Sequence, residues 1–254
     1  MVDNLGDEIE ELAAEGTDQV NIAIAAAGGL YTLSDNVENA RLTNTVAFNV
    51  TGNALVNTLI GNAAANRIDG GAGADDMQGG AGNDTYVVDN VGDKITDTAG
   101  IDTVETGLDF TLADKLTLEN ITLTGSAVVS ATGNTLANIL DGSQNSAANV
   151  LTGGKGNDTY IVGAGDIVQE LASEGTDLVQ SLVSYTLTDN VENLTLIGSA
   201  NINATGNTLN NTLIGNIGNN QLYGGLGVDI LKGCLLYTSP SPRDRTRSRM
   251  PSSA

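Results

Sequence analysis

The chain repeats a unit of nine residues, and this repetition limits the folds open to it more than any other feature. From Gly52 to Val87 it reads as four consecutive nonapeptides, GNALVNTLI, GNAAANRID, GGAGADDMQ and GGAGNDTYV. The last two match the pattern G-G-x-G-x-D-x-U-x at every specified position, where U is a large apolar or aromatic residue. A unit this short cannot bury its own apolar residue, so the fixed period predicts that successive units stack into a solenoid.

The nine-residue register continues after the glycine-rich units. Residues 88–105 keep an acidic residue at position six and an apolar residue at position eight, so six nonapeptides are in phase over 52–105. A second block starts at Gly133 and reaches GGKGNDTYI at 153–161, and a third runs from Gly206 to Lys232. In the first block the sixth positions are Asn57, Asn66, Asp75, Asp84, Asp93 and Asp102, and the eighth positions are Leu59, Ile68, Met77, Tyr86, Ile95 and Val104.

A longer cassette repeats above the nonapeptides. VENARL at Val37, LENITL at Leu118 and VENLTL at Val191 are each followed by T-G-N-x-L-x-N, with spacings of 81 and 73 residues. Because this pattern is interrupted at both ends, we expect the chain to be part of a longer protein. The expected divisions are a partial β-rich cassette (1–51), a first block (52–105), a β spacer (106–132), a second block (133–168), a β spacer (169–205), a truncated third block (206–233) and a tail (234–254).

The spacing within each nonapeptide predicts its local structure. Glycine, aspartate and asparagine tolerate the positive φ angles of a tight turn, and only x-U-x remains for a short strand. Two nonapeptides would close one coil, and coils would stack through parallel hydrogen-bond ladders about 4.8 Å apart. We therefore expect an all-β fold, a parallel β-roll or β-helix solenoid, with the position-eight side chains in one continuous core. Helical periodicity is weak and is confined to 8–15 and 169–174.

The turns also predict a metal-binding chemistry. Stacking would place each turn against that of the second nonapeptide along, where aspartate carboxylates and glycine carbonyls can supply the six to eight oxygen ligands of Ca²⁺. Asp75 should then lie beside Asp93, and Asp84 beside Asp102, on opposite edges. The shorter spacer leaves open whether Asp158 pairs with Asp166. The candidate calcium ligands are Asp75, Asp84, Asp93, Asp102, Asp158, Asp166 and Asp229, with Gly71, Gly73, Gly80, Gly82, Gly154 and Gly156.

Other recurrent residues have simpler explanations. Tyr86 and Tyr160 occupy position eight and are expected in the core. Glu38, Glu119 and Glu192 recur once per cassette and are expected as solvated residues at strand ends. We expect turn formation or a side-chain ladder, rather than metal ligation, from Asn57, Asn66, Asn138, Asn149, Asn211 and Asn220.

Composition excludes several classes of function. Four of the ten basic residues and one of the 31 acidic residues lie beyond Gly233, which leaves a net charge of −24 on 1–233 and argues against binding to nucleic acid. Residues 1–233 contain no histidine or cysteine, the usual ligands of zinc, so oxygen-binding cations remain. Without histidine, G-x-S-x-G or a Walker loop, we expect no enzyme. No apolar run is long enough for a membrane span, and VDNLGDEIEE after Met1 does not resemble a signal peptide.

The tail differs from the rest of the chain. All three prolines and the single cysteine lie beyond Gly233. CLLYTSPSPRD at 234–244 resembles the translation of a sequencing-library adapter, and the residues after it resemble the continuation of that adapter. We therefore expect 234–254 to be non-native and disordered, and exclude it from the fold.

Residues 1–233 resemble the RTX (repeats-in-toxin) haemolysin-type arrays of large secreted bacterial proteins. The resemblance rests on GGAGADDMQ, GGAGNDTYV, GGKGNDTYI and the VENLTL cassette. It implies a calcium-binding β-roll, folding triggered by calcium outside the cell, and export by the type I secretion machinery to the extracellular space or cell surface. Two functions fit: a calcium-dependent folding and secretion module, or a repeat segment of an adhesin or surface-layer stalk.

Overall fold

A computed structural model describes residues 1–13 and 15–233. The predicted adapter-like tail, 234–254, lies outside the described residues. The described residues form 24 short strands and no helix, so the all-β prediction is confirmed. Although 8–15 and 169–174 carry weak helical periodicity, neither stretch is helical where it is described. No helix in the described part is long and apolar enough to cross a membrane.

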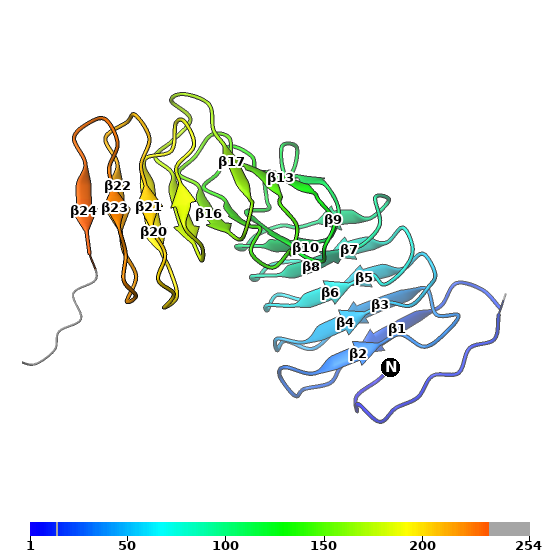
Figure 1. The fold of residues 1–254 in the computed structure, drawn as a ribbon. Helices are drawn as coiled ribbons and strands as arrows, with labels where there is room; N and C mark the ends of the chain where they lie inside the picture. Colours follow the sequence, from blue (N-terminus) through cyan, green and yellow to red (C-terminus); the bar gives the residue numbers. More distant parts are fainter. Residues whose placement is uncertain (14, 234–254) are drawn as a thin grey trace, which may run out of the picture.

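All strand pairs are parallel, and strands pair with every second strand along the chain (Figure 1). One face is a continuous sheet of twelve strands. In order, these are β2 (Leu30–Thr32), β4 (Asn49–Thr51), β6 (Arg67–Asp69), β8 (Thr85–Val88), β10 (Thr103–Thr106) and β12 (Asn120–Leu123). The sheet continues with β14 (Ile139–Asp141), β16 (Thr159–Val162), β18 (Leu178–Ser181), β20 (Asn193–Leu196), β22 (Thr212–Ile214) and β24 (Ile230–Lys232).

The remaining strands form three shorter sheets. The first contains β1 (Gln19–Ile22), β3 (Asn39–Leu42), β5 (Thr58–Ile60), β7 (Asp76–Gln78) and β9 (Lys94–Thr96). The second contains β11 (Phe110–Thr111), β13 (Ser130–Thr132), β15 (Val150–Thr152) and β17 (Ile167–Gln169). The third contains β19 (Tyr185–Thr186), β21 (Ala204–Thr205) and β23 (Leu222–Tyr223). With one strand of the long sheet per coil, the molecule is a solenoid of about twelve coils in which blocks and spacers are continuous.

The register confirms that two nonapeptides close one coil. Leu59 pairs with Met77, which pairs with Ile95, while on the other face Ile68 pairs with Tyr86. The middle residue of each three-residue strand points inward, as the period of two along a strand requires. The position-eight residues 59, 68, 77, 86 and 104 are fully buried in one apolar core.

Ile95 is the exception to the prediction of a continuous position-eight core. It packs against the core but is only partly buried. The cause is its place in the fold, because β9 is the last strand of its sheet and β11 starts a new sheet rather than pairing with it. A second break of this kind separates β17 from β19.

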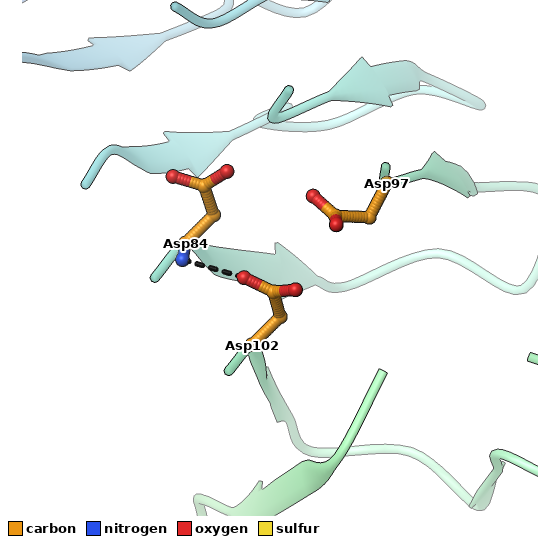
Figure 2. Close-up of side chains that lie close together, drawn as sticks. All are labelled: Asp84, Asp97 and Asp102. Carbon is orange, nitrogen blue, oxygen red and sulfur yellow. Dashed lines mark hydrogen bonds between the residues drawn. The ribbon is translucent and has the colours of Figure 1, made fainter. Parts of the chain in front are cut away.

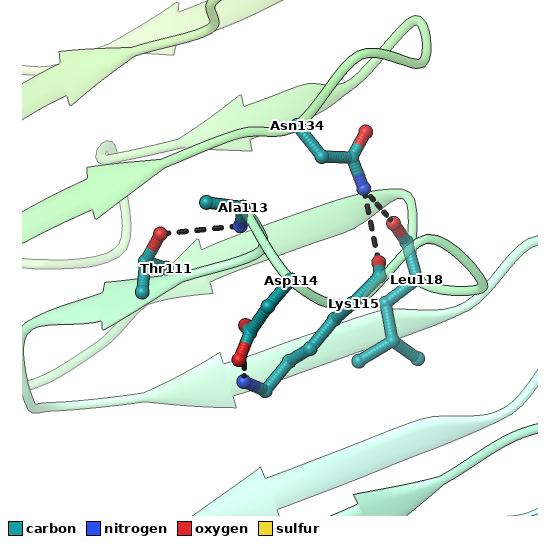
Figure 3. A network of polar contacts seen from close by, with 6 residues as sticks. All are labelled: Thr111, Ala113, Asp114, Lys115, Leu118 and Asn134. Carbon is teal, nitrogen blue, oxygen red and sulfur yellow. Dashed lines mark hydrogen bonds and ion pairs between the residues drawn. The ribbon is translucent and has the colours of Figure 1, made fainter.

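Coils that lack a second glycine are joined by side-chain amides. The Asn134 amide donates to the carbonyls of Lys115 and Leu118 in the preceding coil, at 3.0 and 2.8 Å (Figure 3). Asn53 makes the equivalent pair of bonds to Ser34 and Val37. Asn62, Asn145, Asn207 and Asn216 also donate to two carbonyls of the preceding coil. These Gly-Asn coils therefore satisfy their stacking surface without any ion.

Candidate metal centre

The glycine-rich turns bring the chain closer to the preceding coil than a side chain would allow. Gly71, Gly73, Gly80, Gly82, Gly154 and Gly156 all have positive φ angles, between 75° and 146°. A Cβ atom on Gly156 would lie 2.2 Å from the Leu136 carbonyl oxygen, and one on Gly73 would lie 2.4 Å from that of Leu55. Only glycine fits these positions, which explains the G-G-x-G part of the pattern.

Position-six carboxylates form a ladder along each edge of the solenoid. The backbone N–H of Asn57 donates to Asp75 Oδ1 at 2.7 Å, and that of Asp75 donates to Asp93 Oδ1 at 3.0 Å. On the other edge, the N–H of Asp84 donates to Asp102 Oδ1 at 2.7 Å. The structure thus brings together both predicted pairs. Asp75 and Asp84 precede strands of different sheets, as the register predicts.

In the second block the structure resolves the pairing that the sequence left open. The N–H of Asp158 donates to Asp177 Oδ1 at 2.8 Å, so Asp177, not Asp166, is its partner. Asp166 lies one half-coil earlier, before β17, and its Oδ1 accepts from the N–H of Asn149 at 2.9 Å. In the third block, Asp229 Oδ1 accepts from the N–H of Asn211 at 2.9 Å.

The second carboxylate oxygen separates the predicted ligands into two groups. In Asp75, Asp84, Asp102 and Asp158 the Oδ2 atom is buried and has no hydrogen-bond partner. By contrast, Asp93 Oδ2 accepts from two backbone N–H groups and Asp166 Oδ2 accepts from Gly163. The first group therefore has oxygen atoms available for a cation, whereas the oxygens of Asp93 and Asp166 are already engaged.

The predicted glycine carbonyls are not equally available either. The Gly80 carbonyl accepts hydrogen bonds from the backbone and hydroxyl of Thr98 and from the N–H of Ala99. It could ligate an ion only by sharing its lone pairs with these donors.

Two clusters of three acids lie at equivalent places in the first and second blocks. In each cluster one carboxylate oxygen per residue lies within 4.8 Å of the others. The first consists of Asp84, Asp97 and Asp102 (Figure 2), and the second of Asp158, Glu170 and Asp177. Each cluster combines the last G-G-x-G-x-D aspartate of its block with two acids from the coil that follows.

Sequence reasoning missed Asp97, Glu170 and Asp177 as site residues. One signal was available, since G-x-D recurs at 16–18, 100–102 and 175–177, and the structure pairs both Asp102 and Asp177 with a G-G-x-G-x-D aspartate. Asp97 and Glu170 gave no such signal, because they lie five and seven residues before the G-x-D aspartate and differ in type.

Tyr86 and Tyr160 are fully buried, as predicted, and their hydroxyls also contact the clusters. Tyr86 donates to Asp97 Oδ1 at 2.6 Å and accepts from the N–H of Gly79 at 3.0 Å. Tyr160 makes the corresponding bonds with Glu170 and Gly153. Burial, and then the hydrogen bond to Asp97, raise the pKa of Tyr86, so its hydroxyl remains a donor.

The buried acids are destabilised as anions when no cation is present. Burial raises the pKa of Asp75 and Asp84 to about 6, and the pKa of Asp102 and Asp158 to about 7. For Glu170, burial first and then the charges of Asp177 and Asp158 raise the pKa to about 8. A divalent cation would reverse these shifts, because an opposite charge favours the ionised form.

The cassette glutamates are not solvated strand-end residues, and that expectation is wrong. Glu38, Glu119 and Glu192 are partly buried and accept the backbone N–H of Asp18, Asp102 and Asp177 respectively, at 2.8 to 2.9 Å. Each therefore occupies the next rung of the position-six ladder. The longer glutamate side chain reaches the N–H where the coil carries no glycine turn.

The asparagines at position six behave as predicted for turn formers. Asn57 Oδ1 accepts from the N–H of Asn53, while its amide donates to the Val37 and Glu38 carbonyls. Asn138 makes the same turn bond with Asn134.

Comparison with known protein families matches the RTX calcium-binding nonapeptide repeat, in four copies, to residues 51–86, 132–166 and 205–233. Comparison with curated proteins and with solved structures gave no match.

Proposed function

Because the chain is an array of RTX calcium-binding nonapeptide repeats, which bind calcium ions, we propose that calcium binding drives the folding of this solenoid within a larger secreted protein. The ions would lie at the stacked turns and use the free oxygens of Asp75, Asp84, Asp102 and Asp158. Asp93, Asp166, Asp229 and the turn glycines complete the candidate ligand set.

One observation carries the proposal. Asp75, Asp84, Asp102 and Asp158 are at most 1% exposed, yet each keeps a buried carboxylate oxygen without a partner. A buried charge is stable only when it is paired or coordinates a metal. Residues 1–13 and 15–233 contain two ion pairs, Arg67 with Glu105 and Lys115 with Asp114, and neither includes these aspartates. A cation bound at the turns would supply the missing partner.

The energetics favour cooperative binding. With dissociation constants of about 10⁻⁴ to 10⁻³ M, typical of extracellular calcium modules, one site contributes only about 0.4 to 1.4 kcal/mol at ~1 mM calcium. Ordering one backbone residue costs a similar amount, about 1 to 2 kcal/mol. Folding therefore requires several sites to act together along the stack.

Calcium dependence also provides a rationale for export. Where free calcium is far below the dissociation constants, the acidic chain would stay extended and could pass through a type I secretion channel. Outside the cell, millimolar calcium would fold it. This part of the proposal is supported by the resemblance to secreted RTX proteins and by the charge of −24 on 1–233.

A calcium titration followed by far-ultraviolet circular dichroism tests the proposal. The strand signal should rise sigmoidally with calcium. Asp84→Asn removes one ligand charge and should shift the midpoint to higher calcium, by about twofold or more. Asp189→Asn is the matched control, because Asp189 is exposed and lies outside the ladder. A full strand signal in metal-free buffer, unchanged by calcium, would refute the proposal.

A stalk segment of an adhesin or surface layer is the second candidate. The uninterrupted twelve-stranded sheet favours it, because the spacers add length to the same rod. The complete reading frame distinguishes the two functions, since an effector domain favours the folding module and many further cassettes favour the stalk.

A further inference from the structure

Two of the acid clusters extend beyond the residues that the nonapeptide repeat accounts for. Asp97 and Asp102 follow the matched stretch that ends at residue 86, and Glu170 and Asp177 follow the one that ends at 166. Resting on the calcium-binding function proposed above, we propose that each GNDTY turn forms a three-carboxylate calcium site with two acids of the next coil. The tyrosine hydroxyl of the turn then positions one of these carboxylates.

The three carboxylates of each site come from separate places on neighbouring coils. Asp84 immediately precedes β8, Asp97 follows β9 and Asp102 precedes β10. Figure 2 shows the Asp84 and Asp97 carboxylates turned toward the same space, with Asp102 beside Asp84. A cation bound there would therefore link two successive coils of the long sheet through Asp84 and Asp102, and the intervening half-coil through Asp97.

Each cluster has buried oxygens that lack a partner. In the first, the Oδ2 atoms of Asp84, Asp97 and Asp102 are buried and accept no hydrogen bond. In the second, Asp158 Oδ2 and Glu170 Oε2 are in the same state, and their side chains are 1% and 8% exposed. Since no basic residue pairs with either cluster among the described residues, a divalent cation is the ligand that matches this charge.

The chemistry of the clusters selects calcium. Every side-chain ligand is an oxygen, and three carboxylates on three segments give the irregular, high coordination that Ca²⁺ accepts and Mg²⁺ does not. Waters and carbonyls can complete the shell. Thiolate or imidazole ligands, which softer metals prefer, are absent from 1–233.

The tyrosine hydroxyl fixes the orientation of the third acid. Because the Gly79 N–H donates to the Tyr86 oxygen, the hydroxyl proton is directed to Asp97 Oδ1. The other Asp97 oxygen then remains free toward the cluster. Tyr160 is held in the same way by the Gly153 N–H and contacts Glu170 Oε1. Tyr86 and Tyr160 are thus positioning residues rather than ligands.

The two clusters reach one arrangement from different sequences. The third acid follows the turn aspartate by 13 residues in the first block, as an aspartate, and by 12 in the second, as a glutamate. The longer glutamate side chain compensates for the shorter connection. Recurrence with a different residue and spacing indicates that the arrangement, rather than the nine-residue register, has been retained.

Terbium luminescence tests the site, since Tb³⁺ replaces Ca²⁺ and its emission is sensitised by a nearby tyrosine. The full chain would be titrated with Tb³⁺ under excitation of tyrosine, and bound calcium would be counted by calorimetry. Glu170→Gln should lose about one ion per chain and the emission from the second site, although Tyr160 is still present. Asp97→Asn should do the same at the first site, so the test does not depend on one variant folding. Asp189→Asn is the control for the loss of a charge.

The role of Tyr160 is tested by a double-mutant cycle. Tyr160→Phe should weaken calcium binding at the second site severalfold in calorimetry, and should have no further effect when Glu170→Gln is already present. Additive losses would indicate that Tyr160 serves only the core.

The two proposals fail differently. If Glu170→Gln and Asp97→Asn keep every ion and the full emission while the chain still folds with calcium, the three-acid sites are refuted and calcium-driven folding stands. If the unmodified chain does not respond to calcium, the proposed function itself is refuted.

Discussion

Position six of each nonapeptide stabilises the stack in one of two ways. An asparagine there donates its amide to carbonyls of the preceding coil, as Asn57 does to Glu38. An aspartate accepts one backbone N–H and leaves its second oxygen buried and free, as Asp75 and Asp84 do. The amide is complete by itself, whereas the carboxylate requires a cation or a proton.

The proton should therefore substitute in part for calcium. Because burial raises the pKa of Asp75 and Asp84 to about 6 and that of Asp102 and Asp158 to about 7, the folded chain binds more protons than the unfolded chain between about pH 4 and pH 7. The stability of the calcium-free fold should then rise as the pH falls through this window. In metal-free buffer, we expect more strand signal in circular dichroism at pH 5 than at pH 8.

Calcium binding should respond to pH in the opposite direction. Protons compete for the same oxygens, so the calcium midpoint at pH 6 should be higher than at pH 8. The Asp84→Asn/Asp158→Asn double variant should reduce both effects, because two of the titrating groups are removed. A calcium midpoint that does not change between pH 6 and pH 8 would contradict the raised pKa values.

At the scale of the coil, the solenoid alternates between segments with and without a need for calcium. Coils with a Gly-Asn turn are joined by amide clamps such as Asn134 to the Lys115 and Leu118 carbonyls. Coils with a Gly-Gly turn have no side chain at that place and approach the preceding coil through glycine. The Gly-Asn coils can thus remain stacked on their neighbours where no ion binds.

Removing one clamp should weaken the fold without changing calcium binding. Asn134→Ala leaves the Lys115 and Leu118 carbonyls without their donor, which should cost about 1 to 3 kcal/mol of unfolding free energy. Urea denaturation at saturating calcium measures this cost, and calorimetry should find the same number of ions. Gln144→Ala, at an exposed residue of the same block, is the control. Loss of an ion on Asn134→Ala would show that the clamp also forms part of a metal site.

The number of half-coils in a cassette determines which edge its acids occupy. The VENARL strand, β3, and the LENITL strand, β12, are nine strands apart, so the cassette moves from one sheet to the other. LENITL and VENLTL, on β12 and β20, are eight strands apart and remain in the same sheet. As a result, both three-acid clusters lie along the twelve-stranded sheet.

For the whole molecule, the nine-residue period was sufficient to predict the fold. It gave the all-β solenoid, the two nonapeptides per coil and the pairing of Asp84 with Asp102, because parallel stacking at a fixed period leaves no other register. Calcium binding followed from the same aspartates and is confirmed for the repeat family.

The features that the sequence did not reveal are those outside this period. Asp97 and Glu170 reach their clusters through connections of different length, and Asp177 pairs with Asp158 at a spacing of 19 rather than 18 residues. The partial exposure of Ile95 depends on the end of a sheet, which no local pattern marks. Glu119 is held by a backbone N–H of another coil, a contact that only the stacked structure defines.

Small-angle X-ray scattering with and without calcium tests the central claim most directly, because it measures the size of the whole chain. An unfolded chain of 254 residues has a radius of gyration of about 55 Å, whereas twelve coils about 4.8 Å apart form a rod with a radius of gyration of about 20 Å. We expect the larger value in metal-free buffer at pH 8 and a value near that of the rod at saturating calcium, with Asp84→Asn requiring more calcium to reach it. The same compact rod in both buffers would contradict the claim that calcium drives folding.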